Sequence, residues 1–456
     1  MSNKGITTLA GDFAASDNSV YYLYSLSQKG LNLPFDLLKN AQISNFTAYG
    51  SYFSDGKQTY YIDNEGKNVT VVNGISAFEY GVSSGTIPNS GEPPLLTDKN
   101  NDTYFVNGNN AKKLNVKGVT KSTGNRVLTA EGTLYNADDL ENDTPVFTKI
   151  AENIVDVSAV LYKDKYGVAY SLSNNKPFVG NIKAIFGEFA VAFDGTNYRV
   201  HKDGSISKIF NSEVIDSWTS VGGLTTQEDG FALTADLNMY GRNYWFDVWL
   251  SEDDYWNAEW NGDTGWEIDV SKAIYETPYI NASSSWAVAA VNTADSLGLS
   301  TSELSANYQA TTTRAEFCRA AVNFLRKFGY DVDGVTPKLF ADTTDRDIGI
   351  AAALGVTSGT DAAKNLFSPD NTLTREQAAG MLRNVLNVIG ADTKTSGVKW
   401  TDADSISSYT KDAADVMYTA KIMGGTSTTA LVFSPKTPYT HEQSIGTLVN
   451  LWEYLK

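Results

Sequence analysis

Three helix starts in the last third of the chain each place a cationic side chain directly after a threonine. These side chains are Arg314 in "TTRAEF", Arg375 in "LTREQA" and His441 in "YTHEQS". A cation in the first turn opposes the helix macrodipole, so capping alone does not account for it. Free backbone N–H groups, the positive end of the dipole and a guanidinium together suit an anion. We therefore expect anion binding here; the alternative is that the arginines pair with carboxylates such as Asp342 or Asp402.

The same stretches contain the signals that begin a helix. Thr313, Thr374 and Thr440 are each followed three residues later by Glu or Gln, which is the capping-box pattern. Apolar residues then recur at helical spacing, so each helix should bury one face. The threonines recur at intervals of roughly 60 residues, which predicts three helix–loop–helix repeats. The repeats span residues 281–330, 331–391 and 392–456.

These repeats resemble S-layer homology (SLH) domains. The resemblance rests on the three helix starts, on the openings "LFADTTDRDI" and "KWTDADSISS", and on the lead-ins "FSPDNTLT" and "FSPKTPYT". It implies an all-α, pseudo-trimeric bundle with ligand grooves between repeats. It also implies non-covalent attachment to the secondary cell-wall polysaccharide of Gram-positive-type bacteria. That polymer often ends in pyruvylated N-acetylmannosamine, whose carboxylate would be the bound anion.

The resemblance also implies which residues bind the polysaccharide. They are Arg314, Arg375, His441, Asp342, Asp402, Trp286, Trp400, Gly359 and Gly425. The two glycines, like Gly298, would let the backbone approach the sugar, or would instead cap a helix C-terminus. Two positions depart from the family pattern, since Asn281 replaces an aspartate and His441 an arginine. Because histidine is mostly neutral at pH 7, we expect the third groove to be weak or silent.

Residues 1–245 have the pattern of β-structure, with short strand-like runs separated by Gly, Asn and Asp turns. Seven candidate repeats predict an all-β propeller of about seven blades, and a pair of β-sandwiches is the alternative. Pieces such as "SDGKQTYY" and "KDKYGVAY" loosely resemble the repeat of regulator-of-chromosome-condensation propellers. The candidate repeats begin at Ile6, Ile43, Ile75, Val116, Ile154, Ile182 and Ile215.

A tryptophan-rich join, residues 246–280, comes after the predicted propeller. Five of the nine tryptophans lie in or beside it, interleaved with acidic residues. They could stack on sugars, but we favour packing of the propeller against the C-terminal part of the chain. These tryptophans are Trp245, Trp249, Trp256, Trp260 and Trp266.

The composition excludes several classes of function. A net charge of −17 over 456 residues argues against nucleic acid as a partner. One cysteine, Cys318, excludes an intrachain disulfide, and we expect it to be a buried packing residue. Two histidines exclude a His-rich metal site and disfavour a histidine-based triad. We expect no cofactor and no membrane span. The start "MSNKGITTLAGDFAAS" does not have the pattern of a signal peptide.

Together these features predict a non-enzymatic, extracellular protein of the cell wall or S-layer. The helical repeats would anchor it, and the propeller would display a face that binds a protein or a glycan. One alternative is a wall-anchored glycan hydrolase or lyase, for which Glu252, Asp253, Asp254 and Glu259 offer carboxylates. Another is a phage or injection-device protein that recognises the same polymer.

Overall fold

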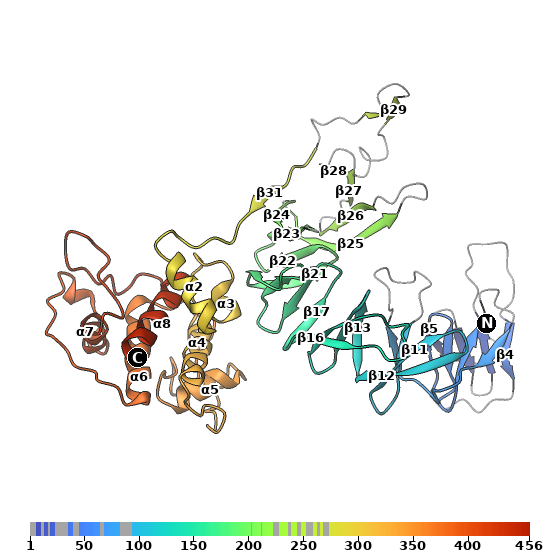
Figure 1. The fold of residues 1–456 in the computed structure, drawn as a ribbon, viewed down its shortest axis with the longest axis horizontal. Helices are drawn as coiled ribbons and strands as arrows, with labels where there is room; N and C mark the ends of the chain where they lie inside the picture. The colour runs from blue at the N-terminus through green and yellow to red at the C-terminus, as the bar shows by residue number, and fades with distance from the viewer. Residues whose placement is uncertain are drawn as a thin grey trace. The chain divides into compact units, whose positions relative to one another are not determined.

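A computed structural model describes the chain over most of its length. The described residues are 6–10, 13–16, 19–22, 35–39, 45–63, 68–82, 94–201, 203–210, 212–221, 228–235, 239–243, 248–251, 259–261, 265–267 and 273–456. The chain divides into a sheet unit, chiefly residues 1–279, and a helical unit, chiefly 280–456. Figure 1 shows the strands in blue to yellow-green and the helices in yellow to red. The predicted layout of a sheet-rich part followed by a helical part is confirmed.

The sheet unit is built from antiparallel meanders, in which each strand pairs with the next one along the chain. The first sheet is β1 (Ile6–Ala10), β2 (Phe13–Ser16), β3 (Ser19–Tyr22) and β4 (Phe35–Lys39). The second is β5 (Thr47–Tyr49), β6 (Tyr52–Ser54), β7 (Thr59–Ile62) and β8 (Val69–Val71). The third is β9 (Tyr80–Val82), β10 (Leu95–Thr97), β11 (Asp102–Asn107) and β12 (Asn110–Lys117). The fourth is β13 (Val119–Thr123), β14 (Arg126–Thr129), β15 (Leu134–Ala137) and β16 (Phe147–Ala151).

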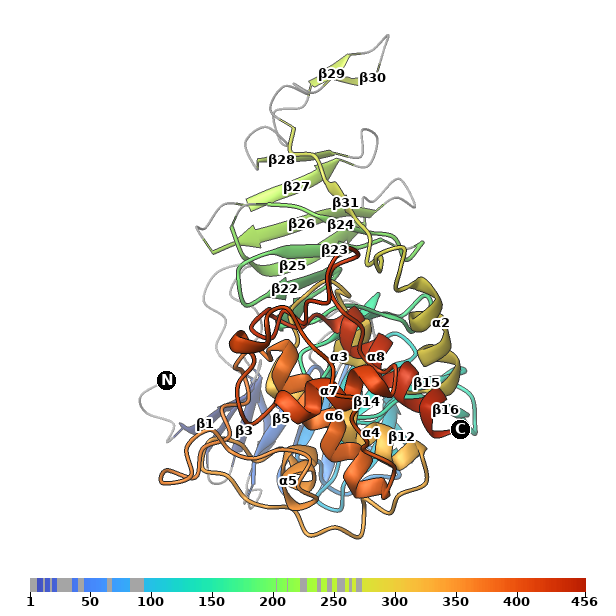
Figure 2. The same ribbon diagram turned by 90° about the vertical axis from the view of Figure 1, so that its left-hand side faces the viewer.

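Three further meanders complete the series, and the strands of the last of them, β25 to β28, lie side by side in Figure 2. The fifth sheet is β17 (Ile154–Val157), β18 (Leu161–Asp164), β19 (Ala169–Ser171) and β20 (Pro177–Val179). The sixth is β21 (Ile182–Phe186), β22 (Phe189–Ala192), β23 (Asn197–Val200), β24 (Ile206–Lys208) and a fifth strand, β31 (Thr277–Tyr279). The seventh is β25 (Val214–Val221), β26 (Glu228–Thr234), β27 (Met239–Asn243) and β28 (Val248–Ser251). A separate hairpin pairs β29 (Glu259–Asn261) with β30 (Gly265–Glu267).

An aspartate and a tyrosine explain the turn pattern seen in the sequence. Asp55 accepts the backbone N–H groups of residues 57 and 58 at 2.8 Å and the Tyr60 hydroxyl at 3.1 Å. Asp164 accepts the N–H groups of residues 166 and 168 at 2.9 Å and the Tyr170 hydroxyl at 3.0 Å. The carboxylate thus closes the turn while the tyrosine of the next strand fixes it. The recurring turn-plus-tyrosine pieces are therefore hairpins between the second and third strands of a sheet.

Successive sheets of the unit pack against one another through apolar side chains. Phe13 of the first sheet and Phe53 of the second lie in one cluster, with ring centroids 5.1 Å apart. Leu95 of the third sheet and Val127 of the fourth lie in another. This serial packing differs from the face-to-face pair of sheets expected of a sandwich. No closed ring is detected among the described residues, so the propeller and its blade count stay predictions.

The predicted tryptophan-rich join contributes to the sheets themselves. Its residues include β28 of the seventh sheet and β31 of the sixth. Trp249 is fully buried against Phe189 and Phe210, so this tryptophan has a packing role, within the sheet unit. Trp260 and Trp266 are paired in the register of β29 and β30. Trp245 and Trp256 lie outside the described residues.

A buried cluster around Glu276 fastens the segment before β31 to the sixth and seventh sheets. The Glu276 carboxylate accepts Arg199 Nη1 at 2.5 Å and Trp249 Nε1 at 2.8 Å, and lies 2.9 Å from His201 Nε2. It also accepts the Ser207 hydroxyl. Burial alone would raise the pKa of Glu276, but the contacts from His201, Arg199, Ser207 and Trp249 outweigh it and hold the pKa well below its ordinary value.

In the helical unit, a long amphipathic helix lies near the end of each of the three predicted repeats. The first repeat has α2 (Val288–Leu297), α3 (Ser302–Ser305) and α4 (Arg314–Lys327). The second has α5 (Arg346–Ala353) and α6 (Arg375–Ile389). The third has η2 (Ala403–Ser405), α7 (Lys411–Thr419) and α8 (His441–Leu455). The apolar faces of all three repeats meet in one hydrophobic core, in which Phe317, Leu382 and Leu448 are almost fully buried.

A ring of three backbone hydrogen bonds joins the repeats. The residue before each capping threonine takes part: Thr312 N–H donates to Tyr439 O at 2.7 Å. Leu373 N–H donates to Thr312 O at 2.8 Å, and Tyr439 N–H donates to Leu373 O at 2.9 Å. Because each residue donates to one repeat and accepts from the other, the bonds form a closed cycle. The three bonds thus link the three long-helix starts in a cycle.

Candidate functional site

The capping boxes that the sequence predicts begin all three long helices. In α4 the Thr313 hydroxyl accepts Glu316 N–H at 3.2 Å, while Glu316 accepts Thr313 N–H at 2.6 Å. In α8 the same pair of bonds joins Thr440 and Gln443. In α6 the side chain of Gln377 accepts Thr374 N–H at 3.0 Å. The hydroxyls of Thr313 and Thr440 are therefore occupied in starting α4 and α8, whereas the buried Thr374 hydroxyl has no hydrogen-bond partner.

The first two N–H groups of each helix are also occupied, which corrects the expectation of free donors. In α4, Arg314 N–H donates to Asn371 O at 2.9 Å and Ala315 N–H to Pro369 O at 3.0 Å. The corresponding amides of α6 donate to carbonyls of Thr437 and Pro435, and those of α8 to Ala310 and Tyr308. Each helix start therefore docks on the loop of the next repeat, in cyclic order. An anion at this site would have to be held by side chains.

The Arg314 guanidinium is buried and forms no ion pair with a carboxylate. The side chain is 8% exposed and lies 4.6 Å from the Phe367 ring centroid. Its Nε donates to Phe367 O at 3.2 Å and its Nη2 to Ser358 O at 2.8 Å. Desolvation lowers the pKa of Arg314, an effect that Cys318, Tyr409 and Asp342 partly offset. The guanidinium keeps N–H donors that these two carbonyls do not use.

Arg375 repeats this arrangement one repeat further on. It is 8% exposed, and its guanidinium carbon lies 5.3 Å from the Phe433 ring centroid. Its Nη2 donates to Gly424 O at 2.6 Å, whereas its buried Nε has no hydrogen-bond partner. Neither arginine forms an ion pair within the helical unit, all of which the structure describes. A direct ion pair with Asp342 or Asp402 is therefore absent, although Asp342 lies within electrostatic range of Arg314.

His441 occupies the third equivalent position in a different environment. It is 5% exposed, and its Nδ1 lies 2.9 Å from Ala306 O. Its Nε2 lies 3.4 Å from Glu316 Oε2, so the third position has an acidic neighbour. Burial would raise the pKa of Glu316, but the contacts with His441 and with Thr313 lower it overall.

Asp342 and Asp402 fix the loops that the side chains of Arg314 and Arg375 contact. Asp342 accepts Phe367 N–H at 2.8 Å and Ser368 N–H at 2.7 Å. Asp402 accepts the N–H groups of Phe433 and Ser434 at 2.9 and 2.8 Å. These bonds lower the pKa of Asp342, with the Phe367 amide contributing most. Each aspartate thus positions the phenylalanine under a guanidinium.

In the first repeat, Asn281 stands where the other two have these aspartates. Its side chain donates to Ser305 O at 2.8 Å and its Oδ1 is 3.4 Å from Tyr308 N. It therefore anchors the loop of the first repeat in the way that the aspartates anchor theirs.

The remaining predicted binding residues fall into exposed and buried groups. Trp286 is 59% exposed at the start of the first repeat. Trp400 is buried against Tyr418 and Phe433, with both centroid distances 5.1 Å, and so belongs to the core of the third repeat.

Tyr409 is a candidate that the sequence reasoning missed. It is 67% exposed and lies within electrostatic range of Arg314. Tyr409 stands two residues after Ser407, and Trp286 stands two residues after Ser284. Both serines bind the buried glutamate of a long helix, Glu376 or Glu442. An alignment of the repeats on these serines would have placed Tyr409 at the position equivalent to Trp286.

Two of the three loop glycines lie close to another part of the chain's backbone, with no ligand needed to explain them. A Cβ atom at Gly359 would lie 2.5 Å from Leu366 O, and one at Gly425 would lie 3.3 Å from Val432 O. Only Gly298 of the three candidate loop glycines is the C-cap of a helix, with φ of 64°. At Gly359 the absent side chain therefore allows two segments of one loop to approach closely.

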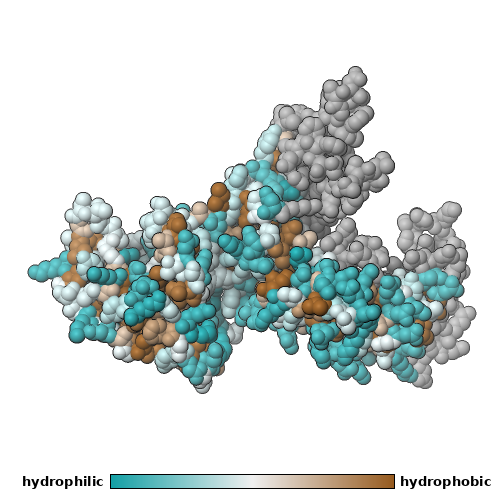
Figure 3. Space-filling view, viewed as in Figure 1, coloured by the Kyte–Doolittle hydropathy of each residue, from teal (hydrophilic) through white to brown (hydrophobic). Residues whose placement is uncertain are grey.

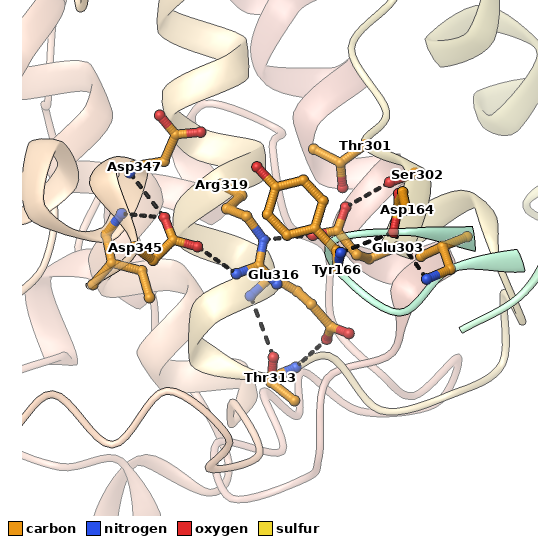
Figure 4. Close-up of polar contacts among 12 residues, drawn as sticks. Asp164, Tyr166, Thr301, Ser302, Glu303, Thr313, Glu316, Arg319, Asp345 and Asp347 are labelled. Carbon is orange, nitrogen blue, oxygen red and sulfur yellow. Dashed lines mark hydrogen bonds and ion pairs between the residues drawn. The ribbon is translucent and has the colours of Figure 1, made fainter. Parts of the chain in front are cut away.

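Buried acids connect the long helices to the first helices of neighbouring repeats. Glu376 is 2% exposed and accepts Ser407 N–H at 2.9 Å, and Glu442 accepts Ser284 N–H at 2.8 Å. The equivalent residue of the first repeat is Ala315, and there α5 is capped by its own Asp345. Arg319 donates to Asp345 at 2.9 Å and also contacts Glu303 (Figure 4). These contacts are structural and involve neither Arg314 nor Arg375; the surroundings of Arg314, Arg375 and His441 are called the first, second and third grooves below.

Other chemistry finds little support in the described parts of the chain. No group of three or more metal-ligating side chains occurs among them. None of their helices has the length and apolar character needed to span a bilayer. Cys318 is fully buried, which raises the pKa of its thiol to about 12 and confirms a packing role. Of the four acids considered for catalysis, Glu252, Asp253 and Asp254 lie outside the described residues.

Comparison with known families identifies one segment of the chain. The S-layer homology domain matches residues 342–379, which run from Asp342 through the start of α6. The matched segment lies in the second predicted repeat, and this match supports a cell-surface protein associated with the cell wall. No curated protein matches the chain.

Two solved structures show only distant similarity. One is PorZ, an essential bacterial surface component of the type-IX secretion system of Porphyromonas gingivalis. It is 10% identical with a TM-score of 0.21, over 52% of this chain and 40% of that one. The other is the tricorn protease, 14% identical with a TM-score of 0.17, over 59% of this chain and 33% of that one. The chain spans less than half the length of either structure.

Proposed function

We propose that the helical unit anchors the protein to an anionic wall polysaccharide, with Arg314 and Arg375 each holding a carboxylate of the polymer. The observation that carries this proposal is the pair of buried guanidiniums without carboxylate partners. Burying an unpaired charge costs free energy. A site that keeps two such charges in equivalent positions is suited to a ligand that supplies the missing anion.

The ring of Phe367 or Phe433 and the backbone carbonyls hold each guanidinium in one orientation. Such preorganisation reduces the conformational entropy lost on binding. Exposed Tyr409, close to Arg314, offers an aromatic face for the pyranose ring next to the carboxylate. A pyruvylated N-acetylhexosamine combines these two features. It is the ligand class that we favour.

For the sheet unit we propose a non-enzymatic role. Its meanders would close into a propeller of about seven blades that displays a face for a protein or a glycan outside the cell. Support comes from seven consecutive meanders of at least four strands that pack in series. A wall-anchored glycan hydrolase or lyase and a phage or injection-device protein remain the alternatives, since each would use the same anchor.

The test is co-sedimentation of the full-length chain with purified wall sacculi, before and after the secondary polysaccharide is stripped. The variants are Arg314→Met, Arg375→Met and the double change, because methionine keeps the stem on the phenylalanine ring. Lys364→Met with Lys394→Met is the matched control, since both lysines are highly exposed.

We expect the polymer to be required and each single change to weaken binding about 10- to 150-fold, in line with loss of a charge-assisted contact worth about 1.5–3 kcal/mol. The double variant should be lost from the pellet. Binding that survives stripping, or that falls equally in the lysine control, would reject the proposal.

A further inference from the structure

The third groove differs from the other two at several matched positions. The groove phenylalanines Phe367 and Phe433 correspond to Ala306, because His441 contacts the Ala306 carbonyl as Arg314 contacts that of Phe367. His441 therefore has no phenylalanine ring at the matched position. The residue at the N3 position of each capping box differs as well, and here the change is one of charge.

Gln377 and Gln443 occupy this N3 position in the second and third repeats, whereas the first has Glu316. All three side chains accept the N–H of the preceding capping threonine. Capping is thus served equally well by the neutral amide and by the acid. What distinguishes Glu316 is its second contact, from Oε2 to His441 Nε2 at 3.4 Å across the repeat boundary.

Each long-helix start docks on the following repeat, and the third repeat is followed by the first. The N3 residue that corresponds to Glu316 beside His441 is therefore Gln377 for Arg314. The arginine grooves thus combine a cation with a neutral amide. The third groove instead combines an imidazole with a carboxylate whose side chain is 19% exposed. An incoming anion would meet a like charge at short range, which is costly in a partly desolvated site.

We propose that Glu316 excludes anions from the third groove, so that the helical unit binds two anionic sugars rather than three. This inference rests on the proposed function and adds the residue that sets the specificity and valency of the site. Glu316 is a positioning residue for α4 as well, so a useful variant must preserve its capping bond. Glutamine does so in both other repeats.

The test is a calorimetric titration of the full-length chain with the methyl glycoside of pyruvylated N-acetylmannosamine, and with the same glycoside lacking pyruvate as control. We expect two sites per wild-type chain. Glu316→Gln combined with His441→Arg should create a third site. Glu316→Gln alone, which retains the capping bond, should add a third site of lower affinity.

The reciprocal change is Gln377→Glu, which would place a carboxylate facing Arg314. We expect this variant to lose one site while remaining at least as stable as the wild type, because it supplies an ion pair to a buried guanidinium. The control is Gln309→Glu, which adds the same charge at an exposed position in the loop of the first repeat.

The outcomes separate the two claims. Three sites in the wild type, or an unchanged number in the Glu316 and Gln377 variants, would overturn the role of Glu316 and leave the arginine grooves intact. Absence of pyruvate-dependent binding by the wild type would overturn the proposed function itself, and the inference with it.

Discussion

At the scale of single residues, each arginine proposed to bind the polymer carries a cost in stability. Arg314 and Arg375 are 8% exposed and interact with carbonyl dipoles and aromatic rings rather than with carboxylates. Carbonyl groups compensate the desolvation of a guanidinium only in part. The unliganded protein therefore retains these charges at a cost that ligand binding would recover.

Replacing either arginine by methionine should consequently stabilise the unliganded helical unit or leave its stability unchanged. We expect a gain of about 0–2 kcal/mol, the range in which buried charges give way to apolar residues of similar length. Thermal unfolding of the full-length variants, followed by hydrogen exchange in peptides of α4 and α6, would measure it. A loss above about 2 kcal/mol would show that the arginines are mainly structural, and Arg319→Met, which breaks two ion pairs, provides that comparison.

At the scale of secondary-structure elements, the Glu276 cluster determines how the strand before the helical unit is held. Arg199 and Ser207 come from β23 and β24, and Trp249 from β28, so one carboxylate joins three strands to the segment leading into β31. Ile274 and Trp249 add two backbone hydrogen bonds. This part of the sheet unit depends on an ionised acid.

Acid should therefore loosen this segment. Because the folded-state pKa of Glu276 is lowered, its contribution is fully present above its ordinary pKa of about 4.3 and is lost as the pH falls below that value. We expect Glu276→Gln to cost about 3 kcal/mol at pH 7 and to remove the dependence on pH below this value. Hydrogen exchange in peptides covering residues 197–208 and 273–279, measured from pH 3 to pH 7, tests this.

Glu152→Gln is the matched control, since Glu152 is exposed and contacts only Lys149. It should leave exchange in these two peptides unchanged. Equal pH profiles for the wild type and Glu276→Gln would mean that the cluster does not hold the segment through its charge.

At the scale of the whole molecule, the net charge and the proposed ligand have the same sign. The chain carries −17, and polar residues cover much of the face drawn in Figure 3, with hydrophobic residues in smaller patches. Under the proposed function, an anionic polymer would be repelled at long range and attracted near the two buried guanidiniums. Salt screens exposed charges over about 10 Å but affects buried contacts much less.

Association should therefore speed up with salt. Between about 20 and 150 mM NaCl, we expect the association rate with immobilised wall polysaccharide to rise several-fold while the dissociation rate changes little. Surface plasmon resonance with the full-length chain would measure both rates. A steep fall of the association rate with salt would instead indicate that a basic surface steers the polymer, which contradicts this proposal.

The sequence was informative wherever a feature depends on neighbours along the chain. Capping boxes, the hairpin turns around Asp55 and Asp164, and the three helical repeats are all determined by local spacing. Prediction from the sequence failed where a group's contacts come from residues about one repeat away or from the far end of the same repeat. The amides of Arg314 and Ala315 are satisfied by residues 371 and 369, and Trp400 is covered by residues 418 and 433. Such contacts exist only once the repeats fold and pack.

The cycle formed by Thr312, Leu373 and Tyr439 has a consequence for how such a protein can change over evolutionary time. Solenoids grow by adding one repeat at an end, since each unit needs only a neighbour. A cycle has no free end. A fourth repeat would therefore find no repeat to bond with, and loss of one repeat would leave two inter-repeat contacts unformed. Gain or loss should proceed by whole triplets. By the same reasoning, a circularly permuted gene that opens the chain between other repeats would still encode the same closed assembly.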